Sequence, residues 1–191
     1  MLIGFTGLAQ SGKSTACNYI LEKHPTFVKV GFKDAIVEEM RENFAPLLEH
    51  MADIYLTTID DLFTKKPPLM RKLMQCYGTE VRRGDDPEYW INQWKESIKD
   101  KTGWLALLDN LGFIPDVLCD DVRFLNEATA ISEMGGYLVR IKRPDVTHTG
   151  DHQSETEMLE LEVDYTIEVE PGNLEGLYTK VDNLLASIKE R

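Results

Sequence analysis

The sequence predicts an α/β fold, a five-stranded parallel sheet with helices on both faces. Three observations support this prediction. Short apolar runs alternate with helical patterns, and a glycine-rich loop joins the first apolar run to the first helical pattern. Residues 33–115 have helical periodicity and no strong strand pattern until their end. We therefore expect one domain over residues 1–191, with a helical insertion at 33–115 and a flap at 143–157.

The N-terminal part of the chain predicts a β-α-β unit. Residues 2–6 form a short apolar run typical of a buried strand, and residues 13–23 have helical spacing of their apolar side chains. Residues 27–32 follow Pro25 and are rich in β-formers, which predicts a second strand. The two strands and the helix between them are the expected start of a parallel sheet.

The insertion is predicted to contain at least three helices. Pro67-Pro68 and the Gly84–Pro87 turn interrupt its helical pattern, and the last helix is expected at about 88–98. Trp90 and Trp94 are spaced i and i+4 on that helix. Such a pair more often packs in a core than stacks on a nucleobase.

The C-terminal part predicts the remaining strands and helices. Strand patterns occur at 116–120, 137–142 and 165–169, and helical patterns lie between and after them at 125–134 and 174–189. Because strands alternate with helices, the sheet is expected to be parallel and covered on both faces.

The amino-acid composition argues against several classes of protein. The net charge of −12 argues against binding to a nucleic-acid backbone, which requires clustered Lys and Arg. The three cysteines form no C-x-x-C pair, and no apolar run is long enough for a membrane helix. We expect a cytoplasmic protein without nucleic-acid or membrane partners.

The strongest motif is GLAQSGKST, which follows the first strand and fits G-x-x-x-x-G-K-[ST], the P-loop. In such a loop the backbone N–H groups surround phosphates, the lysine reaches the outer phosphates and the serine hydroxyl ligates Mg²⁺. The predicted ATP-binding residues are Gly7, Ala9, Gln10, Ser11, Gly12, Lys13, Ser14 and Thr15.

A second group of residues follows the strand at 116–120. Asp120 is the first candidate for a Mg²⁺ ligand and Asp121 the second, although an Asp after a strand often only caps the next helix. Arg123 offers a planar donor fork for a phosphate, or alternatively a surface ion pair with Glu127.

Two further groups carry basic residues. Arg82 and Arg83 are able to bind a phosphate monoester, with a solvated charge pair as the alternative. Arg143 lies at the start of the predicted flap, where an arginine can reach a transferred phosphate as the flap closes. His148 and His152 lie in this flap without a further ligand pair, so a metal site is not favoured there.

A GTPase reading is disfavoured by the position of its motifs. Asp109–Gly112 spells D-x-x-G, but it precedes the candidate metal strand. Thr179–Asp182 spells T-K-x-D, but it lies inside an amphipathic helical pattern, where it cannot recognise guanine. A kinase of small molecules fits the order of motifs better, since phosphoryl transfer needs mainly alignment and charge neutralisation.

Several of these segments resemble the phage-type deoxynucleoside monophosphate kinases. The residues that carry the resemblance are the P-loop, Tyr77-Gly78-Thr79-Glu80 with Arg82-Arg83, Asp86-Pro87-x-x-Trp90, Asp121-Val122-Arg123-Phe124-x-Asn126-Glu127-Ala128, Val139-Arg140-Ile141-x-Arg143-Pro144 and His152-x-Ser154-Glu155. They are spread over most of the chain.

The resemblance implies an ATP- and Mg²⁺-dependent kinase that phosphorylates a deoxynucleoside 5′-monophosphate, often as a homodimer. It makes Arg82, Arg83 and Arg123 candidates for the acceptor phosphate and Arg143 a flap arginine that serves the transferred group. Together with the motif analysis, the predicted catalytic residues are Lys13, Asp120, Arg123 and Arg143, and the predicted metal ligands are Ser14 and Asp120. The predicted substrate-binding residues are Lys33, Glu80, Arg82, Arg83, Trp90, Asp121 and Arg123. Relatives often have F-A-D-x-L-K after the second strand, whereas here Lys33 precedes Asp34.

Two other functions stay open on the sequence alone. One is a P-loop kinase of another phosphomonoester, such as phosphomevalonate or dephospho-coenzyme A. The other is a nucleotide-binding regulatory module without turnover. Gln75, Glu80, Trp90 and Asn126 are equivalent candidates for a base contact.

Overall fold

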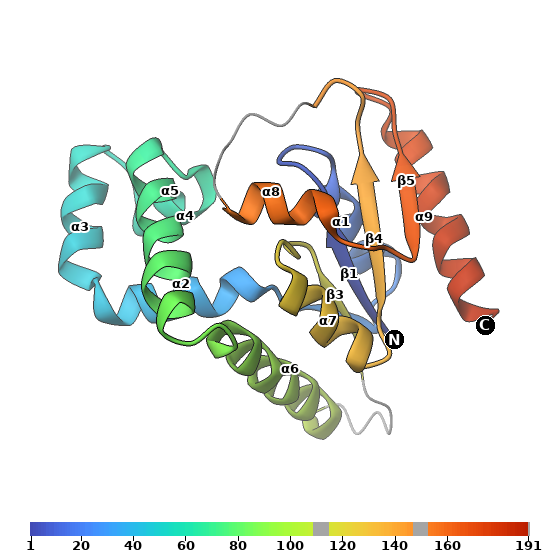
Figure 1. The fold of residues 1–191 in the computed structure, drawn as a ribbon, viewed down its shortest axis with the longest axis horizontal. Coiled ribbons are helices and arrows are strands. Elements are labelled where there is room, and N and C mark those ends of the chain that lie inside the picture. Colours follow the sequence, from blue (N-terminus) through green and yellow to red (C-terminus); the bar gives the residue numbers. More distant parts are fainter. Residues whose placement is uncertain (109–114, 147–152, 191) are drawn as a thin grey trace. The chain divides into compact units, whose positions relative to one another are not determined.

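A computed structural model describes residues 1–108, 115–146 and 153–190 (Figure 1). The chain forms two compact units. Unit 1 comprises Met1–Gly31 and Ser97–Arg191, and unit 2 comprises Phe32–Glu96.

Unit 1 contains a five-stranded, entirely parallel sheet, which confirms the predicted fold class. Its strand order is β2-β3-β1-β4-β5. The strands are β1 (Leu2–Thr6), β2 (Phe27–Lys29), β3 (Asp116–Cys119), β4 (Tyr137–Lys142) and β5 (Tyr165–Glu168). Because all strands run the same way, their carboxyl ends meet at one edge, where ligands bind in folds of this class.

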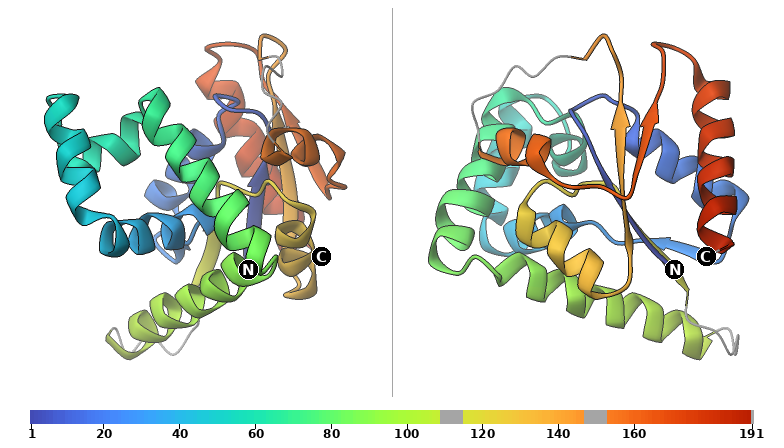
Figure 2. Two further views of the ribbon diagram at one scale, coloured as in Figure 1. Left: turned by 60° about the vertical axis from the view of Figure 1, so that its left-hand side comes forward. Right: turned by 45° about the vertical axis from the view of Figure 1, so that its right-hand side comes forward.

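Helices cover both faces of this sheet. They are α1 (Lys13–Lys23), α7 (Leu125–Glu133), α8 (Gln153–Glu160) and α9 (Leu174–Lys189). α1 and α9 contact each other on one face, and α7 packs on β1 and β4 (Figures 1 and 2). Ile3 and Phe5 of β1 share a core with Ile20 of α1 and Val181 of α9, and all four are fully buried.

The second strand is shorter than predicted. β2 ends at Lys29, and Phe32 already begins a helix. Between these elements the backbone of Gly31 passes close to a carboxylate: a Cβ on Gly31 would lie 2.9 Å from Asp121 Oδ2. This close approach depends on tertiary structure and leaves no periodic signal in the sequence.

Unit 2 is helical, as the periodicity of its sequence predicts. Its elements are α2 (Phe32–Asn43), α3 (Ala45–Ile54), α4 (Ile59–Lys65), α5 (Pro68–Gln75), the π-helix η1 (Cys76–Arg83) and the first part of α6 (Tyr89–Leu108). Met40, Leu48, Leu62 and Met70 are fully buried in a core of their own, which also includes Trp90.

α6 is longer than the helix predicted at 88–98. It continues through Gly103 to Leu108, and Thr102 Oγ1 donates a hydrogen bond of 2.7 Å to the Ile98 carbonyl inside it. None of the helices in the described part of the chain combines the length and apolar character needed to cross a membrane.

Candidate active site

The P-loop connects β1 to α1 through three residues with positive φ: Gly7 (133°), Gln10 (64°) and Gly12 (108°). Such angles allow successive N–H groups to face one concavity, which suits an anion. A Cβ on Gly7 would lie 2.3 Å from the Ile141 carbonyl oxygen, so glycine is required there for steric reasons as well.

The N-terminus of α1 is suited to an anion. Its N-cap residue Gly12 supplies no side-chain cap, and the first turn contains no acidic residue. Ser11 is 2% exposed, and its hydroxyl has no hydrogen-bond partner within residues 1–108, 115–146 and 153–190. The helix dipole, the absence of acidic residues in the first turn and the Ser11 hydroxyl together favour a bound phosphate.

The P-loop borders a cavity of about 260 Å³. Its walls are formed by Gln10, Ser11, Gly12, Lys13, Ser14, Thr15, Arg143, Val169, Glu170, Gly172, Asn173, Leu174 and Leu177. Residues 169–173, which follow β5 and supply four of these lining residues, carry no motif that predicts them as part of the site. Only the predicted parallel sheet indicates this segment, because in such a sheet the segment after each strand starts at the same edge as the P-loop.

Lys13 folds back onto its own loop. Its Nζ donates hydrogen bonds to the carbonyl oxygens of Gly7 (2.6 Å) and Leu8 (2.7 Å). The ammonium group is therefore held beside the concavity of the loop, where a lysine of this motif can reach phosphate oxygens.

The structure brings Ser14 and Asp120 together, although they are 106 residues apart. Ser14 Oγ donates a 2.7 Å hydrogen bond to Asp120 Oδ2. The ammonium group of Lys29, from the end of β2, lies 2.5 Å from the same oxygen. The Asp120 side chain has no exposed surface, so its charge requires such partners. A hydroxyl and a carboxylate are hard oxygen ligands of the kind that Mg²⁺ prefers.

Asp121 lies in a different environment from Asp120. Its Oδ1 accepts a hydrogen bond of 3.1 Å from Cys119 Sγ, and its carboxylate packs against the backbone of Gly31. Of the two candidate metal ligands, Asp120 is therefore the one that contacts the P-loop serine.

Arg123 is partly exposed at the start of α7. In the described part of the chain its guanidinium makes no hydrogen bond or ion pair. The alternative, a surface ion pair between Arg123 and Glu127, is wrong, because Glu127 is only 3% exposed and its carboxylate binds backbone N–H groups. Its Oε2 accepts hydrogen bonds from the backbone N–H groups of Arg123 (2.8 Å) and Phe124 (3.2 Å), which caps α7.

Arg143 connects the start of the predicted flap to the P-loop. Its Nη1 donates a 3.0 Å hydrogen bond to the Gln10 carbonyl, and its Nε and Nη2 bind Asp145 at 3.0 and 2.5 Å. The hydrogen bonds to Asp145 raise the pKa of Arg143. His148 and His152 lie outside the described residues. The end of the flap region is helical and belongs to α8.

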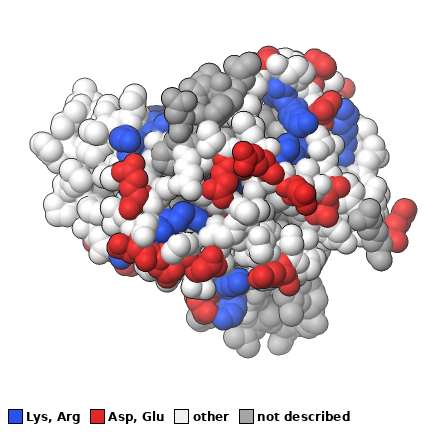
Figure 3. Space-filling model, in the orientation of Figure 1, with Lys and Arg blue, Asp and Glu red and all other residues white. Residues whose placement is uncertain are grey.

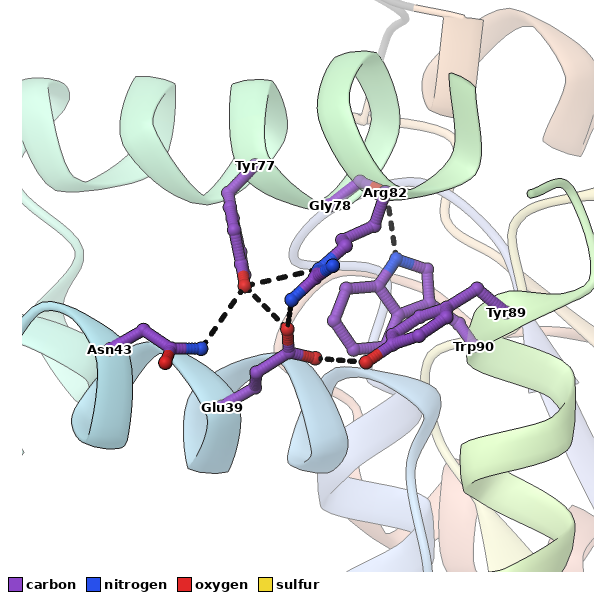
Figure 4. A network of polar contacts seen from close by, with 7 residues as sticks. All are labelled: Glu39, Asn43, Tyr77, Gly78, Arg82, Tyr89 and Trp90. Carbon is purple, nitrogen blue, oxygen red and sulfur yellow. Dashed lines mark hydrogen bonds and ion pairs between the residues drawn. The ribbon is translucent and has the colours of Figure 1, made fainter. Parts of the chain in front are cut away.

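In unit 2, Arg82 belongs to a polar network around Glu39 (Figure 4). Arg82 Nη2 and Tyr77 Oη donate to Glu39 Oε1, and Tyr89 Oη donates to Oε2 at 2.8 Å. The guanidinium also lies over the rings of Tyr77 and Tyr89, at 5.5 and 5.0 Å from their centres. The network fixes the Arg82 side chain, which remains 35% exposed.

The other residues predicted in unit 2 occupy varied environments. Trp90 is 1% exposed and donates a 2.7 Å hydrogen bond to the Gly78 carbonyl, which favours the core alternative over a base contact. Glu80 is exposed and lies 3.8 Å from Lys72. Lys33 and Arg83 are partly buried. No cluster of three or more potential metal-binding side chains occurs among the described residues.

The sheet, the P-loop after β1 and the Ser14–Asp120 pair define an α/β protein of the P-loop kinase class. The crystal structure of TT1252 from Thermus thermophilus has a similar fold, with a TM-score of 0.50 and 16% identity over 98% of this chain and 97% of that one. No family model matches the sequence.

A curated protein of Acanthamoeba polyphaga mimivirus, named "Putative deoxynucleotide monophosphate kinase", is 31% identical over 188 residues, which cover 95% of this chain and 94% of the viral one. The chain therefore belongs to the nucleoside-monophosphate-kinase-like family of this relative.

Proposed function

We propose that the protein transfers the terminal phosphoryl group of ATP to a deoxynucleoside 5′-monophosphate, giving the diphosphate. The observation that carries the proposal is the P-loop at the N-terminus of α1, which lies beside the Ser14–Asp120 pair. The name of the viral relative supports the choice of acceptor.

The donor nucleotide is assigned to the cavity beside the P-loop. The loop amides and Lys13 bind its phosphates, and the wall formed by Val169, Gly172 and Asn173 is available to the rest of the nucleotide. Arg143 lies on the same cavity, with a hydrogen bond to the loop carbonyl of Gln10. Its position supports a role beside the outer phosphates.

Ser14 and Asp120 are the residues that would hold Mg²⁺. They supply two hard oxygen atoms 2.7 Å apart, and Asp120 is buried, as expected for a carboxylate that balances a cation. When bound, Mg²⁺ neutralises charge on the phosphate oxygens during transfer.

The acceptor phosphate is assigned to arginine side chains. Arg123 offers an unpaired guanidinium within the described part of unit 1, two residues after Asp121. Arg82 and Arg83 of unit 2 are the further candidates. Since phosphoryl transfer requires alignment and charge neutralisation and no protein nucleophile, these cations and the P-loop supply the groups that the reaction needs.

A coupled assay of ADP release tests the proposal. The four deoxynucleoside monophosphates are compared with their ribonucleotide counterparts, phosphomevalonate and dephospho-coenzyme A, each with ATP and Mg²⁺. We expect at least one deoxynucleotide to give the highest kcat/KM. Turnover of only another phosphomonoester would reassign the acceptor, and ATP binding without any turnover would indicate a regulatory module. Light scattering of the same sample tests the homodimer implied by the family resemblance.

A further inference from the structure

Lys29 is a charged residue next to the candidate metal ligands, and the proposed function gives it no role. It ends β2, and its Nζ lies 2.5 Å from Asp120 Oδ2, the oxygen that also accepts the hydrogen bond from Ser14. The Asp120 side chain is fully buried, whereas the Lys29 side chain is 27% exposed. One carboxylate oxygen therefore has two donors, one of which is a cation with access to solvent.

The burial of Asp120 accounts for its contact with Lys29. A carboxylate without exposed surface is costly unless a cation or several hydrogen bonds compensate it. Lys29 supplies that positive charge. A divalent cation held by Ser14 and Asp120 would supply it instead, and it would repel an ammonium group bound to the same oxygen. The metal ion and Lys29 therefore compete for Asp120.

The sheet order indicates where Lys29 can act after it leaves Asp120. β3 lies between β2 and β1, so Lys29 approaches Asp120 from the β2 side and Ser14 approaches it from the P-loop side. The donor phosphates bind on the P-loop side. A second phosphate bound on the β2 side of Asp120 would lie within reach of Lys29, because the four-carbon chain of a lysine is flexible.

We propose that Lys29 is the counter-cation of Asp120 in the metal-free protein, and that metal binding releases its ammonium group to bind the acceptor phosphate. The second half of this proposal rests on the proposed kinase function.

The first measurement is metal affinity. Lys29→Met removes the charge and keeps most of the apolar chain, Lys29→Arg keeps the charge, and Lys101→Met is the matched control. Lys101 donates a 3.3 Å hydrogen bond to the Lys29 carbonyl and is exposed.

Mn²⁺ is titrated into each protein in the presence of a non-hydrolysable ATP analogue and without acceptor, and its binding is followed by electron paramagnetic resonance. We expect Lys29→Met to bind Mn²⁺ roughly three- to tenfold more tightly, and Lys101→Met to match the wild type. Unchanged or weaker Mn²⁺ binding by Lys29→Met would overturn the competition.

The second measurement is acceptor affinity. The deoxynucleotide preferred by the wild type is titrated calorimetrically into each variant with Mn²⁺ and the ATP analogue. Loss of a charge-assisted phosphate contact should weaken acceptor binding about tenfold or more in Lys29→Met, with much of it restored in Lys29→Arg. Affinity for the ATP analogue should stay within about twofold, because that nucleotide binds on the other side of Asp120. A loss confined to the ATP analogue would assign Lys29 to the donor and overturn the proposal.

The two proposals fail in different ways. If the wild type phosphorylates no deoxynucleotide, the proposed function fails, and the Mn²⁺ titration still decides whether Lys29 competes for Asp120. If the wild type is active but Lys29→Met binds metal and acceptor as the wild type does, only the assignment of Lys29 fails. Thermal unfolding of each variant identifies a loss of affinity that comes from misfolding.

Discussion

Asp120 and Asp121 are adjacent in the chain but contact different groups. Asp120 contacts Ser14 and Lys29, whereas Asp121 contacts Cys119 and the backbone near Gly31. The two neighbouring carboxylates therefore have different partners, and of the two Asp120 is the one hydrogen-bonded to the P-loop. This difference carries our assignment of the metal to Asp120.

Replacing Asp120 by Asn should lower kcat by about a hundredfold or more, because a neutral amide is a poor ligand for Mg²⁺. Mutating a residue that only hydrogen-bonds to a metal ligand already lowers activity by about 10- to 100-fold, so the loss of a ligand should cost at least as much. Steady-state kinetics over a range of Mg²⁺ concentrations measures the effect. Asp116→Asn is the control, since Asp116 lies at the opposite end of β3 and pairs with the N-terminal amine. Equal losses in both variants would point to damage of the strand instead.

Replacing Arg123 by Ala should lower kcat/KM for the acceptor by roughly a hundredfold, as expected for loss of a cation that stabilises transferred charge. Binding of ATP should change little. Calorimetric titration of the ATP analogue and steady-state kinetics test the two statements separately. Lys in place of Arg123 should restore activity only in part, because it lacks the planar fork. Unaltered kinetics in Arg123→Ala would remove this residue from the site.

At the scale of elements, Glu39 joins three helices of unit 2. Its carboxylate accepts hydrogen bonds from η1 through Tyr77 and Arg82 and from α6 through Tyr89, while Glu39 itself belongs to α2. Burial acts to raise the pKa of Glu39, but the hydrogen bonds from Tyr77, Tyr89 and Arg82 outweigh it, so the pKa is lowered. The ionised form therefore stabilises the folded unit.

Glu39→Gln should lower the free energy of unfolding by about 1–3 kcal/mol near pH 7, because it replaces a charged acceptor of three hydrogen bonds. The pKa of Glu39 is lower in the folded than in the unfolded protein. The stabilisation by ionised Glu39 is therefore complete at pH values above the pKa in the unfolded chain, about 4.3, and is lost as the pH falls through the pKa in the folded protein. Urea unfolding followed by tryptophan fluorescence at several pH values measures it. A difference between the proteins that grows below pH 4 would contradict this account.

The C-terminal end of α8 is held by Arg140 of β4. Arg140 Nη2 donates hydrogen bonds to the carbonyl oxygens of Met158 (3.2 Å) and Leu161 (2.6 Å), and burial lowers the pKa of the arginine. Arg140→Met should release this end of the helix and raise amide exchange there by roughly tenfold, since hydrogen bonds from charged groups contribute about 1.5–3 kcal/mol. Hydrogen exchange of residues 153–161 measures the change.

Lys142→Met is the control for this experiment. Lys142 lies two residues further along β4, is exposed and makes only a long ion pair of 3.9 Å with Glu168. An exposed pair of this kind contributes little, so exchange in α8 should stay near the wild-type rate. Equal exchange in the two variants would show that Arg140 does not anchor the helix.

For the whole molecule, the net charge of −12 contrasts with the basic groups of the candidate site. On the described part of the face in Figure 3, Asp and Glu are interspersed with Lys and Arg, without a continuous basic area. In the proposed function the positive potential for a nucleotide is local and comes from Lys13, the amides of α1 and the nearby arginines.

Nucleotide binding should stabilise the folded protein. ATP with Mg²⁺ at about a hundred times its Kd should add about 2.7 kcal/mol, which corresponds to roughly 5–10 °C in Tm for a chain of this size. Differential scanning calorimetry with and without ATP measures the shift. Lys13→Met should lose most of it, because in the proposed function this lysine contacts the phosphates. The same shift in this variant would place the nucleotide elsewhere.

Local patterns were sufficient to predict the P-loop, the five strands and the helical character of unit 2. Each depends on residues close in the chain: a loop motif follows a strand directly, and periodicity reports the buried face of one element. The length of α6 and the early end of β2 were not predicted; the close approach of Gly31 to Asp121, which lies far away in the chain, leaves no local pattern.

The contacts between distant residues required the folded chain. Ser14 meets Asp120, Lys29 reaches that same carboxylate, and the segment after β5 borders the P-loop cavity only because parallel strands end at one edge. Glu39 and Arg82, 43 residues apart, meet through the packing of their helices. Spacing along a sequence specifies elements through local sterics and hydrogen bonding, whereas the partner of a buried charge depends on which elements pack beside it.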